Sequence, residues 1–277
     1  MERGSSPFRE GGALRFCLVY PNTHAVGSCN LGFAELFRSI NGNSHCTAER
    51  LFALDLSRKP LERPRSIETA RPLDEFAVIA ISFMSELDYL NAALLLENAG
   101  IPWAKKDRDD DSPLILAGGA APSLNPAPVS AMADLVVQGE WEAGAEQILE
   151  ALHSAWRKRG RGFRTCLSSF IEGRCLDGSL ISKLPPAKEV GASLSLIPDK
   201  GAFGDMALIE ATRGCPWSCR FCTAKALYRP YRCVDPQRII QYAQDMKGSF
   251  SSLGLVGAGL SARPDLLELL QALLERD

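Results

Sequence analysis

The sequence predicts an α/β protein in which a Rossmann-like, doubly wound parallel sheet is followed by the first β/α units of a second domain. Short, continuously apolar runs alternate with amphipathic segments over residues 14–160, as in a parallel sheet that is covered on both faces. Residues 161–204 show no sustained period and predict a linker. Two further strand–helix pairs occupy residues 205–277, and a cysteine-rich loop follows the first of their strands.

The first domain is expected to hold about five strands, each a short apolar run that ends at a turn. These runs are residues 14–20, 50–54, 77–82, 114–117 and 134–138. Helices are expected at residues 30–40, 87–98 and 142–158. Asn30 is a suitable cap for the first helix, and Gly100 is a natural terminator of the second. The polar stretches at residues 57–72 and 105–111 predict solvated connections.

The composition excludes several classes of protein. The chain has 277 residues, 46% of them hydrophobic, and a formal net charge of -2, which gives no electrostatic case for binding nucleic acid or an anionic membrane. No apolar run approaches the roughly 20 residues of a membrane span. Residues 1–13 predict a flexible, polar tail without the apolar core of a signal peptide. We therefore expect a cytoplasmic protein whose nine cysteines are metal ligands or buried thiols.

The second domain begins with a strand at residues 207–212, which the turn Arg213-Gly214 ends. A helix at residues 236–247, a strand at 252–256 and a helix at 264–275 complete it. Two β/α units cannot cover their own sheet edge. We therefore expect the chain to be a fragment of a longer protein.

The loop after this strand contains Cys215, Cys219 and Cys222, spaced C-x-x-x-C-x-x-C. Electron-carrying [4Fe–4S] proteins use four thiolates, one for each iron. A loop with three thiolates holds only three corners of such a cluster and leaves one iron open, much as a catalytic zinc keeps an open position. Its location at the carboxyl end of a strand is the usual place for chemistry in α/β proteins.

The spacing, with the aromatic Phe221 directly before the last cysteine, resembles the signature of the radical S-adenosylmethionine (radical SAM) superfamily. The resemblance implies a core shaped as a partial TIM barrel and a [4Fe–4S] cluster whose open iron is chelated by SAM. It also implies reductive cleavage of SAM to a 5′-deoxyadenosyl radical, with an electron donor such as flavodoxin or ferredoxin. By the same analogy, Phe221 would lie against the adenine of SAM.

Two further features are candidates for SAM binding. Gly257, Ala258 and Gly259 follow the second strand, where radical SAM enzymes often carry Gly-Gly-Glu and bind the SAM amino group with backbone atoms. Glu210 shares a strand face with Leu208 and Thr212 and is expected either to contact SAM or to pair with Arg213 or Arg220.

A different class of site stays open for the same cysteines. Cys233 could join the three loop cysteines in a four-thiolate zinc site or a closed electron-transfer cluster. That alternative describes a non-enzymatic metal protein. Cys17 lies inside an apolar strand and is expected to be a small core residue, whereas Cys29, Cys46, Cys166 and Cys175 have no assigned role.

A Rossmann-like domain before a radical SAM core resembles the cobalamin-binding members of the superfamily. Gly118 and Gly119 resemble the glycine turn that lies against the cofactor in such domains, because glycine permits close approach of the backbone. His24 and Gly27 lie in N-x-H-x-x-G, one residue away from the D-x-H-x-x-G motif of cobalamin proteins. The resemblance implies that His24 ligates cobalt, with Asn22 as a neutral partner for its other ring nitrogen.

The resemblance thus implies a radical SAM enzyme that acts on an unidentified substrate with cobalamin, by methyl transfer or rearrangement. The alternative is a radical SAM enzyme whose first domain is a scaffold without cofactor or a module that binds a partner. No G-x-G-x-x-G follows the first strand, so a dinucleotide fingerprint is absent. His45 and His153 are expected to be ordinary surface residues.

Overall fold

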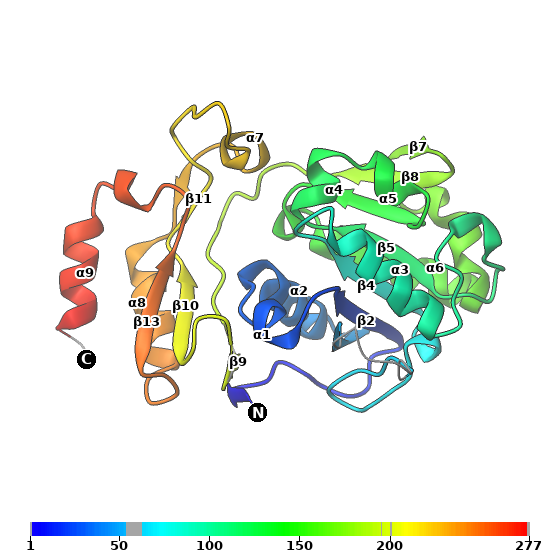
Figure 1. Ribbon diagram of the computed structural model, residues 1–277, viewed down its shortest axis with the longest axis horizontal. Coiled ribbons are helices and arrows are strands. Elements are labelled where there is room, and N and C mark those ends of the chain that lie inside the picture. Colours follow the sequence, from blue (N-terminus) through cyan, green and yellow to red (C-terminus); the bar gives the residue numbers. More distant parts are fainter. Residues whose placement is uncertain (1, 54–62, 195, 200, 276–277) are drawn as a thin grey trace. The chain divides into compact units, whose positions relative to one another are not determined.

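The structure is a computed structural model that describes residues 2–53, 63–194, 196–199 and 201–275. It divides into two compact units, which Figure 1 shows coloured along the sequence. The larger unit comprises residues 7–27 and 36–185, within the described ranges. The smaller unit comprises the described parts of residues 1–6, 28–35 and 186–277. Each unit is therefore assembled from separate stretches of the chain.

The larger unit is built on a mostly parallel sheet of seven strands in the order β3-β2-β4-β5-β6-β8-β7. These strands are β2 Leu14–Tyr20, β3 Cys46–Phe52, β4 Val78–Ser82, β5 Leu114–Gly118, β6 Leu135–Gln138, β7 Arg174–Leu176 and β8 Ser179–Lys183. Numbered along the chain, the first five have the order 2-1-3-4-5, which is that of flavodoxin-like sheets. The prediction of an α/β fold is confirmed.

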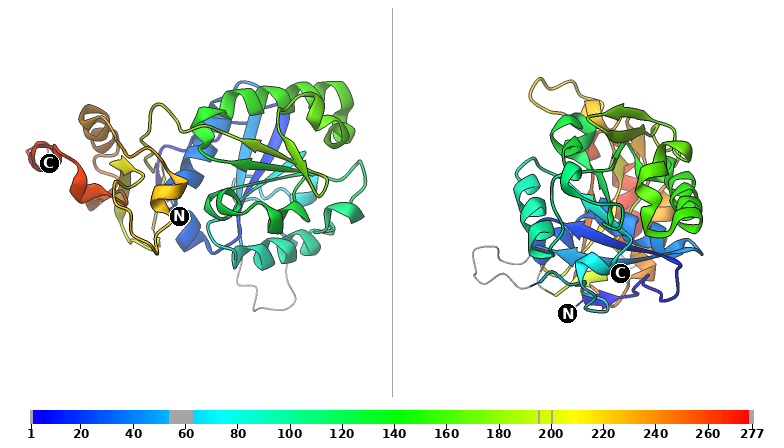
Figure 2. Two further views of the ribbon diagram at one scale, coloured as in Figure 1. Left: turned by 90° about the horizontal axis from the view of Figure 1, so that it is seen from above. Right: turned by 90° about the vertical axis from the view of Figure 1, so that its right-hand side faces the viewer.

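Helices cover both faces of this sheet. They are α1 His24–Gly27, α2 Leu31–Gly42, α3 Asp88–Asn98, α4 Ala120–Leu124, α5 Ala127–Ser130 and α6 Ala145–Arg159, with 3-10 turns at Leu73–Glu75, Lys105–Asp107, Trp141–Ala143 and Gly160–Ser169. Figure 2 shows α6 on one face of the sheet and α3 on the other. The first turn of α2 groups with the smaller unit, and Asn30 caps it by accepting from the Phe33 backbone N–H at 2.9 Å.

The core between the sheet and α3 follows the alternation of the strands. Every second residue of a strand points to the same face, so Cys17 and Val19 join Ile79 and Ile81 in one buried cluster. Ala92, Leu95 and Leu96 of α3 pack into this cluster. Gly100 follows the last residues of α3 with a positive φ of 75°, as expected of a glycine that terminates a helix.

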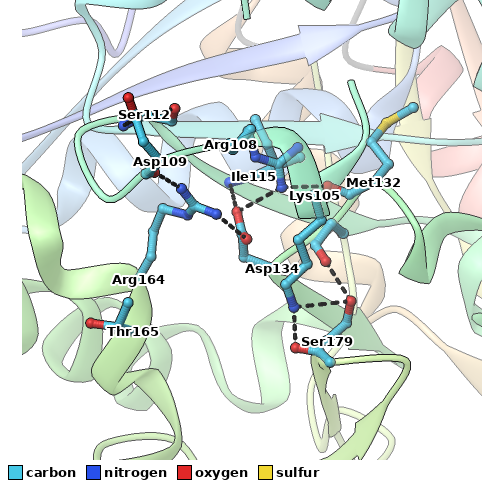
Figure 3. A network of polar contacts seen from close by, with 12 residues as sticks. Lys105, Arg108, Asp109, Ser112, Ile115, Met132, Asp134, Arg164, Thr165 and Ser179 are labelled. Carbon is cyan, nitrogen blue, oxygen red and sulfur yellow. Dashed lines mark hydrogen bonds and ion pairs between the residues drawn. The ribbon is translucent and has the colours of Figure 1, made fainter. Parts of the chain in front are cut away.

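The prediction that residues 105–111 form a solvated connection is wrong for Arg108. Its side chain has no exposed surface, and its guanidinium donates to Met132 O at 2.6 Å and to Asp134 Oδ2 at 3.1 Å. Asp134 also accepts from the Ile115 backbone N–H and, through Oδ1, from Arg164 Nη2 at 3.1 Å. Figure 3 shows the carboxylate of Asp134 between the two arginines. The buried charges are stable here because each has a partner.

The predicted linker is structured in its first part. β8 pairs in parallel with β6, and β7 returns antiparallel to β8, so residues 174–183 extend the sheet. Leu180 and Ile181 are buried in the process. Lys105 donates to Gly178 O, and Ser179 Oγ donates to Ala133 O at 2.5 Å. These bonds attach β8 to the turn at Lys105 and to the segment before β6, and Figure 3 shows the side chains of Lys105 and Ser179.

The described part of the connection at residues 57–72 is also ordered, because it satisfies two buried charges of β3. Glu49 accepts from the hydroxyls of Ser66 and Thr69, each at 2.6 Å. Arg50 Nε donates to Glu68 at 2.7 Å. The strand itself begins earlier than predicted, at Cys46, and residue 54 lies outside the described residues.

The smaller unit contains three short sheets. β10 Met206–Glu210 is parallel to β13 Ser252–Val256, and β11 Thr212–Arg213 is antiparallel to β12 Arg232–Cys233. β1 Glu2–Gly4 is antiparallel to β9 Leu196–Pro198, so the expected flexible tail contains a paired strand. The helices are α7 Ala224–Leu227, α8 Pro236–Asp245 and α9 Leu266–Leu274, with a 3-10 turn at Leu260–Ala262.

None of the helices within the described ranges combines the length and the apolar character that crossing a bilayer requires.

Candidate functional site

The cysteine loop connects β11 to α7 in the smaller unit. Cys215 is half-buried, Cys219 and Cys222 are exposed, and all three are free thiols. Gly214 begins the loop with a φ of 77°, and a Cβ there would overlap Tyr228 O, so only glycine fits. The Cys222 backbone N–H donates to Cys219 O at 3.2 Å, which turns the chain between these two cysteines. The loop therefore presents three thiols on a short, turned backbone.

The turn after β13 lies against the same loop. Because β10 and β13 are parallel, with Glu210 opposite Val256, their carboxyl ends share one edge. A Cβ on Gly257 would overlap Thr212, and one on Gly259 would lie 2.9 Å from Pro216 Cδ. The structure thus brings two residues of the predicted SAM-binding turn, Gly257 and Gly259, into close packing with the strand and loop that carry the cysteines.

Tyr231, directly before β12, connects this strand to the turn at residues 257–259. Its hydroxyl donates to Gly259 O at 2.9 Å and lies 3.7 Å from the sulfur of Cys233. Burial, together with the neighbouring Cys233 thiol, raises the pKa of Tyr231 to about 12, so the hydroxyl keeps its proton for this hydrogen bond. Cys233 itself is exposed on β12, opposite Thr212.

Arg263 holds the backbone on either side of the cysteine loop, at Ala211 and Val234. This residue was not identified from the sequence. Its side chain has no exposed surface, and Nη1 donates to Ala211 O and Val234 O, each at 2.8 Å. Asp265 balances its charge at 2.8 Å. The guanidinium therefore links the residue after β10 to the residue after β12. No local pattern marks this role, because both acceptors are backbone carbonyls from distant segments.

Glu210 forms an ion pair, which was one of the two alternatives open for it. Arg213 Nε donates to Oε1 at 2.7 Å, and Arg213 Nη2 donates to Oε2 at 2.8 Å. The backbone N–H groups of Gly191 and Ala192 donate to Oε2 as well. The carboxylate is thus bonded within the chain and fixes the strand that leads into the cysteine loop.

Phe221 lies at the tip of the loop with 91% of its surface exposed. No other large apolar residue in the described part of the chain is as exposed. An aromatic ring in this position offers a face that a planar ligand could cover.

The carboxyl edge of the seven-stranded sheet carries the residues predicted to bind cobalamin. β2 lies between β3 and β4, so the chain reverses its direction of winding there, and open α/β sheets bind ligands outside such a point. His24 follows β2, begins α1 and packs edge-to-face on Phe52 with ring centroids 4.9 Å apart. Gly118 ends β5 opposite Ser82, two strands away from β2.

Packing and backbone conformation require glycine at two of the positions predicted to bind cobalamin, Gly27 and Gly119. A Cβ on Gly27 would lie 2.6 Å from the ring of Phe52, so this residue is small because aromatic rings pack on it. Gly119 has a φ of 107°, and a Cβ there would overlap the carbonyl of Phe83. Gly118 differs, since its nearest neighbour to a Cβ is Val137 O at 3.5 Å.

Within the described part of the chain, Asn22 bonds to Thr23 and Asp88 rather than to His24. Its Oδ1 accepts from the Thr23 backbone N–H at 2.8 Å, and its Nδ2 donates to Asp88 at 3.3 Å. Asn91 adds a hydrogen bond of 2.9 Å to Pro21 O. Asp88 and Asn91 of α3 therefore hold the loop after β2. The sequence did not indicate either residue, because both resemble ordinary polar positions of an amphipathic helix.

Comparisons with known proteins support the resemblance to radical SAM proteins. Residues 32–173 match the family described as "Radical SAM proteins, N-terminal", a range that does not include the cysteine loop. An uncharacterized protein of Methanocaldococcus jannaschii is 25% identical over 169 residues, which cover 60% of this chain and 34% of that protein. A hopanoid C-3 methylase of Methylococcus capsulatus is 31% identical over 126 residues, which cover 41% of this chain and 22% of that protein. The matched regions thus span about a third or less of either relative.

Proposed function

Because the chain belongs to the family of radical SAM proteins, N-terminal, we propose that it is part of a radical SAM enzyme with a [4Fe–4S] cluster on Cys215, Cys219 and Cys222. The observation that carries the proposal is the packing of the Gly257–Gly259 turn against the cysteine loop. Free, accessible thiols beside a glycine turn are what a three-thiolate cluster and a chelating ligand require. When bound, such a cluster would supply the electron that cleaves SAM and starts radical chemistry on a substrate.

The chain's own residues have distinct parts in this proposal. Backbone groups of Gly257, Ala258 and Gly259 would bind the polar end of SAM, and Phe221 would cover its adenine. Tyr231 fixes the carbonyl of Gly259 and Glu210 fixes the strand before the loop, so both would position the site. An electron donor such as flavodoxin or ferredoxin would reach the exposed side of the loop.

Methyl transfer with cobalamin is the reaction that we propose within this class. The support is the similarity to a methylase and the place of His24 and Gly118 at the carboxyl edge of the sheet. His24 would ligate the cobalt, and the corrin would lie against Gly118, while Gly27 and Gly119 shape the loops. When bound, cobalamin would carry the methyl group to the substrate carbon.

One observation favours a second candidate for this unit. Gly27 and Gly119 are required by packing, and Asn22 bonds to Asp88, so a scaffold without cofactor would also use these residues. Binding of cob(II)alamin to the whole chain distinguishes the two by electron paramagnetic resonance (EPR). Bound cobalt with nitrogen splitting that His24→Ala removes supports the ligand role. Bound cobalt without splitting removes that role alone, and no binding favours the scaffold.

The cluster is tested by anaerobic reconstitution with iron and sulfide. We expect about four iron atoms per chain and an EPR signal of the reduced cluster that changes when SAM is added. Alanine at Cys215, Cys219 or Cys222 should abolish the signal. Cys233→Ala and Cys175→Ala are matched controls, since both remove an exposed thiol. Loss of iron in Cys233→Ala would instead favour a closed four-thiolate site.

A further inference from the structure

Two of the three histidines of the chain lie against each other in the larger unit. The rings of His45 and His153 are stacked, with centroids 4.3 Å apart and planes inclined by 7°. His45 lies in the turn before β3, and His153 lies on α6 with only 6% of its surface exposed. The expectation that both are ordinary surface residues is therefore wrong for His153, which the fold buries against a histidine from a distant segment.

Glu150 completes a group with these two rings. It precedes His153 by three positions on α6, which puts both side chains on the same face of the helix. One ligand atom from each of His45, Glu150 and His153 lies within 4.8 Å of the other two. The Ser154 hydroxyl donates to Glu150 Oε1 at 3.3 Å and orients the carboxylate. Outer hydrogen bonds of this kind commonly orient metal ligands.

The donor set selects a class of ion. Two imidazole nitrogens and one carboxylate oxygen suit zinc and the divalent ions of iron, cobalt or nickel, whereas magnesium and calcium prefer oxygen ligands only. Ligand atoms of a tetrahedral zinc ion lie about 3.4 Å apart, given bonds of about 2.1 Å. Imidazole lone pairs lie in the ring plane, so one of the two parallel rings must turn before both nitrogens point at one ion. His45 and Glu150 are exposed and have room to turn toward the buried His153.

We propose that His45, Glu150 and His153 form a binding site for a divalent transition-metal ion, with one coordination position left to water. The carbonyl of His45 accepts from Leu14 N at 3.0 Å, so the site lies at the amino ends of β2 and β3. It is therefore at the opposite end of the sheet from the loop of His24. Bound metal joins the turn before β3 to α6, and it is independent of the cysteine loop. Arg157, one helical turn beyond His153, is the positive charge that opposes the ion.

The low histidine content gives a direct test. The full chain with Cys215, Cys219 and Cys222 replaced by serine is labelled at histidine with carbon-13 and nitrogen-15 and titrated with zinc chloride. Two of the three imidazole signals should shift in a one-to-one titration, while that of His24 stays in place, and chelation with EDTA should reverse the change. Zinc at an exposed cysteine away from this site, such as Cys175 or Cys233, would leave the signals of His45 and His153 unmoved.

Variants test whether His45 and Glu150 are ligands of the bound zinc. Glu150→Gln and His45→Ala should weaken zinc binding by about tenfold to a hundredfold, since even outer-shell partners of metal ligands contribute that much. Glu146→Gln removes an exposed charge from the same helix and should bind zinc as before. His45→Ala changes an exposed turn residue, so it keeps the test valid if changes at His153 unfold the chain. Unshifted imidazole signals, or equal titrations of the Glu150 and Glu146 variants, would overturn the proposal.

Discussion

Arg213 binds Glu210 at two points, through Nε at 2.7 Å and Nη2 at 2.8 Å. Glu210 is the last residue of β10, and Arg213 lies three positions further along the chain. Both side chains keep little exposure, 12% for Arg213 and 11% for Glu210. The pair lies directly before Gly214, where the chain turns into the loop. The ion pair therefore fixes the backbone that leads directly into the cysteine loop.

Glu210→Gln should destabilise the protein and lower its iron content after reconstitution. Removing one partner of a nearly buried pair leaves the other charge without compensation, at a cost of about 3–5 kcal/mol. Chemical denaturation measures this loss. Glu189→Gln is the matched control, because Glu189 is 90% exposed and lies 3.8 Å from Arg238, a surface pair worth about 0–1 kcal/mol. Equal losses in the two variants would show that the Glu210 pair does not support the loop.

Asp134→Asn should destabilise the larger unit by about 3–5 kcal/mol, because Arg108 and Arg164 would share a buried site without an anion. The same measurement on Asp110→Asn provides the control, since Asp110 is an exposed acid of the same charge run. Near-equal stabilities of Asp134→Asn and the unchanged protein would contradict the structural role of the network.

Gly259→Ala should weaken SAM binding and leave the iron content unchanged. The added methyl group would lie 2.9 Å from Pro216 Cδ and 3.0 Å from Tyr231 Cε2, so the turn must move away from the cysteine loop. Gly162→Ala is the control, because nothing lies within 4 Å of a Cβ there. Equilibrium binding of SAM to the reconstituted proteins measures the effect. Unchanged affinity in Gly259→Ala would remove this turn from the proposed site.

Stability should depend on pH through Glu68. Burial raises its pKa above the usual value of 4.5, although Arg50 acts in the opposite direction. A carboxyl group with a raised pKa in the folded state favours folding fully below its unfolded pKa, and this contribution is lost as the pH rises through the folded value. The free energy of unfolding of Glu68→Gln should therefore fall less steeply above about pH 4.5 than that of the unchanged protein. Parallel pH profiles would exclude this role of Glu68.

The sequence predicted the elements that are encoded locally. The run at residues 14–20 forms β2 with the predicted bounds. Six of its seven residues are apolar, so the local sequence alone is enough to identify it as a buried strand. β8 was not predicted. It contains only two apolar residues, Leu180 and Ile181, and they are buried because β8 pairs with the edge of β6. The prediction for Arg108 was wrong for a related reason, because its partner Asp134 lies in a distant segment, directly before β6.

The candidate site shows the same division. The spacing of Cys215, Cys219 and Cys222 is a local pattern, and the structure places all three on one turned loop. Arg263 and Asp88 could not be identified in this way. The acceptors of Arg263 are carbonyls, which every residue has, and the partner of Asp88 is the side chain of Asn22 on a separate segment. Only the folded chain brings these groups together.

The pairing of β1 with β9 has a consequence for synthesis of the chain. Glu2 is translated nearly two hundred residues before its partner Pro198. At about 5–20 residues per second, this interval is roughly 10–40 s. All seven strands of the larger sheet are translated before that partner appears. The larger unit can therefore fold during translation, whereas the smaller one, which carries the cysteines, combines a segment translated before the larger unit with segments translated after it.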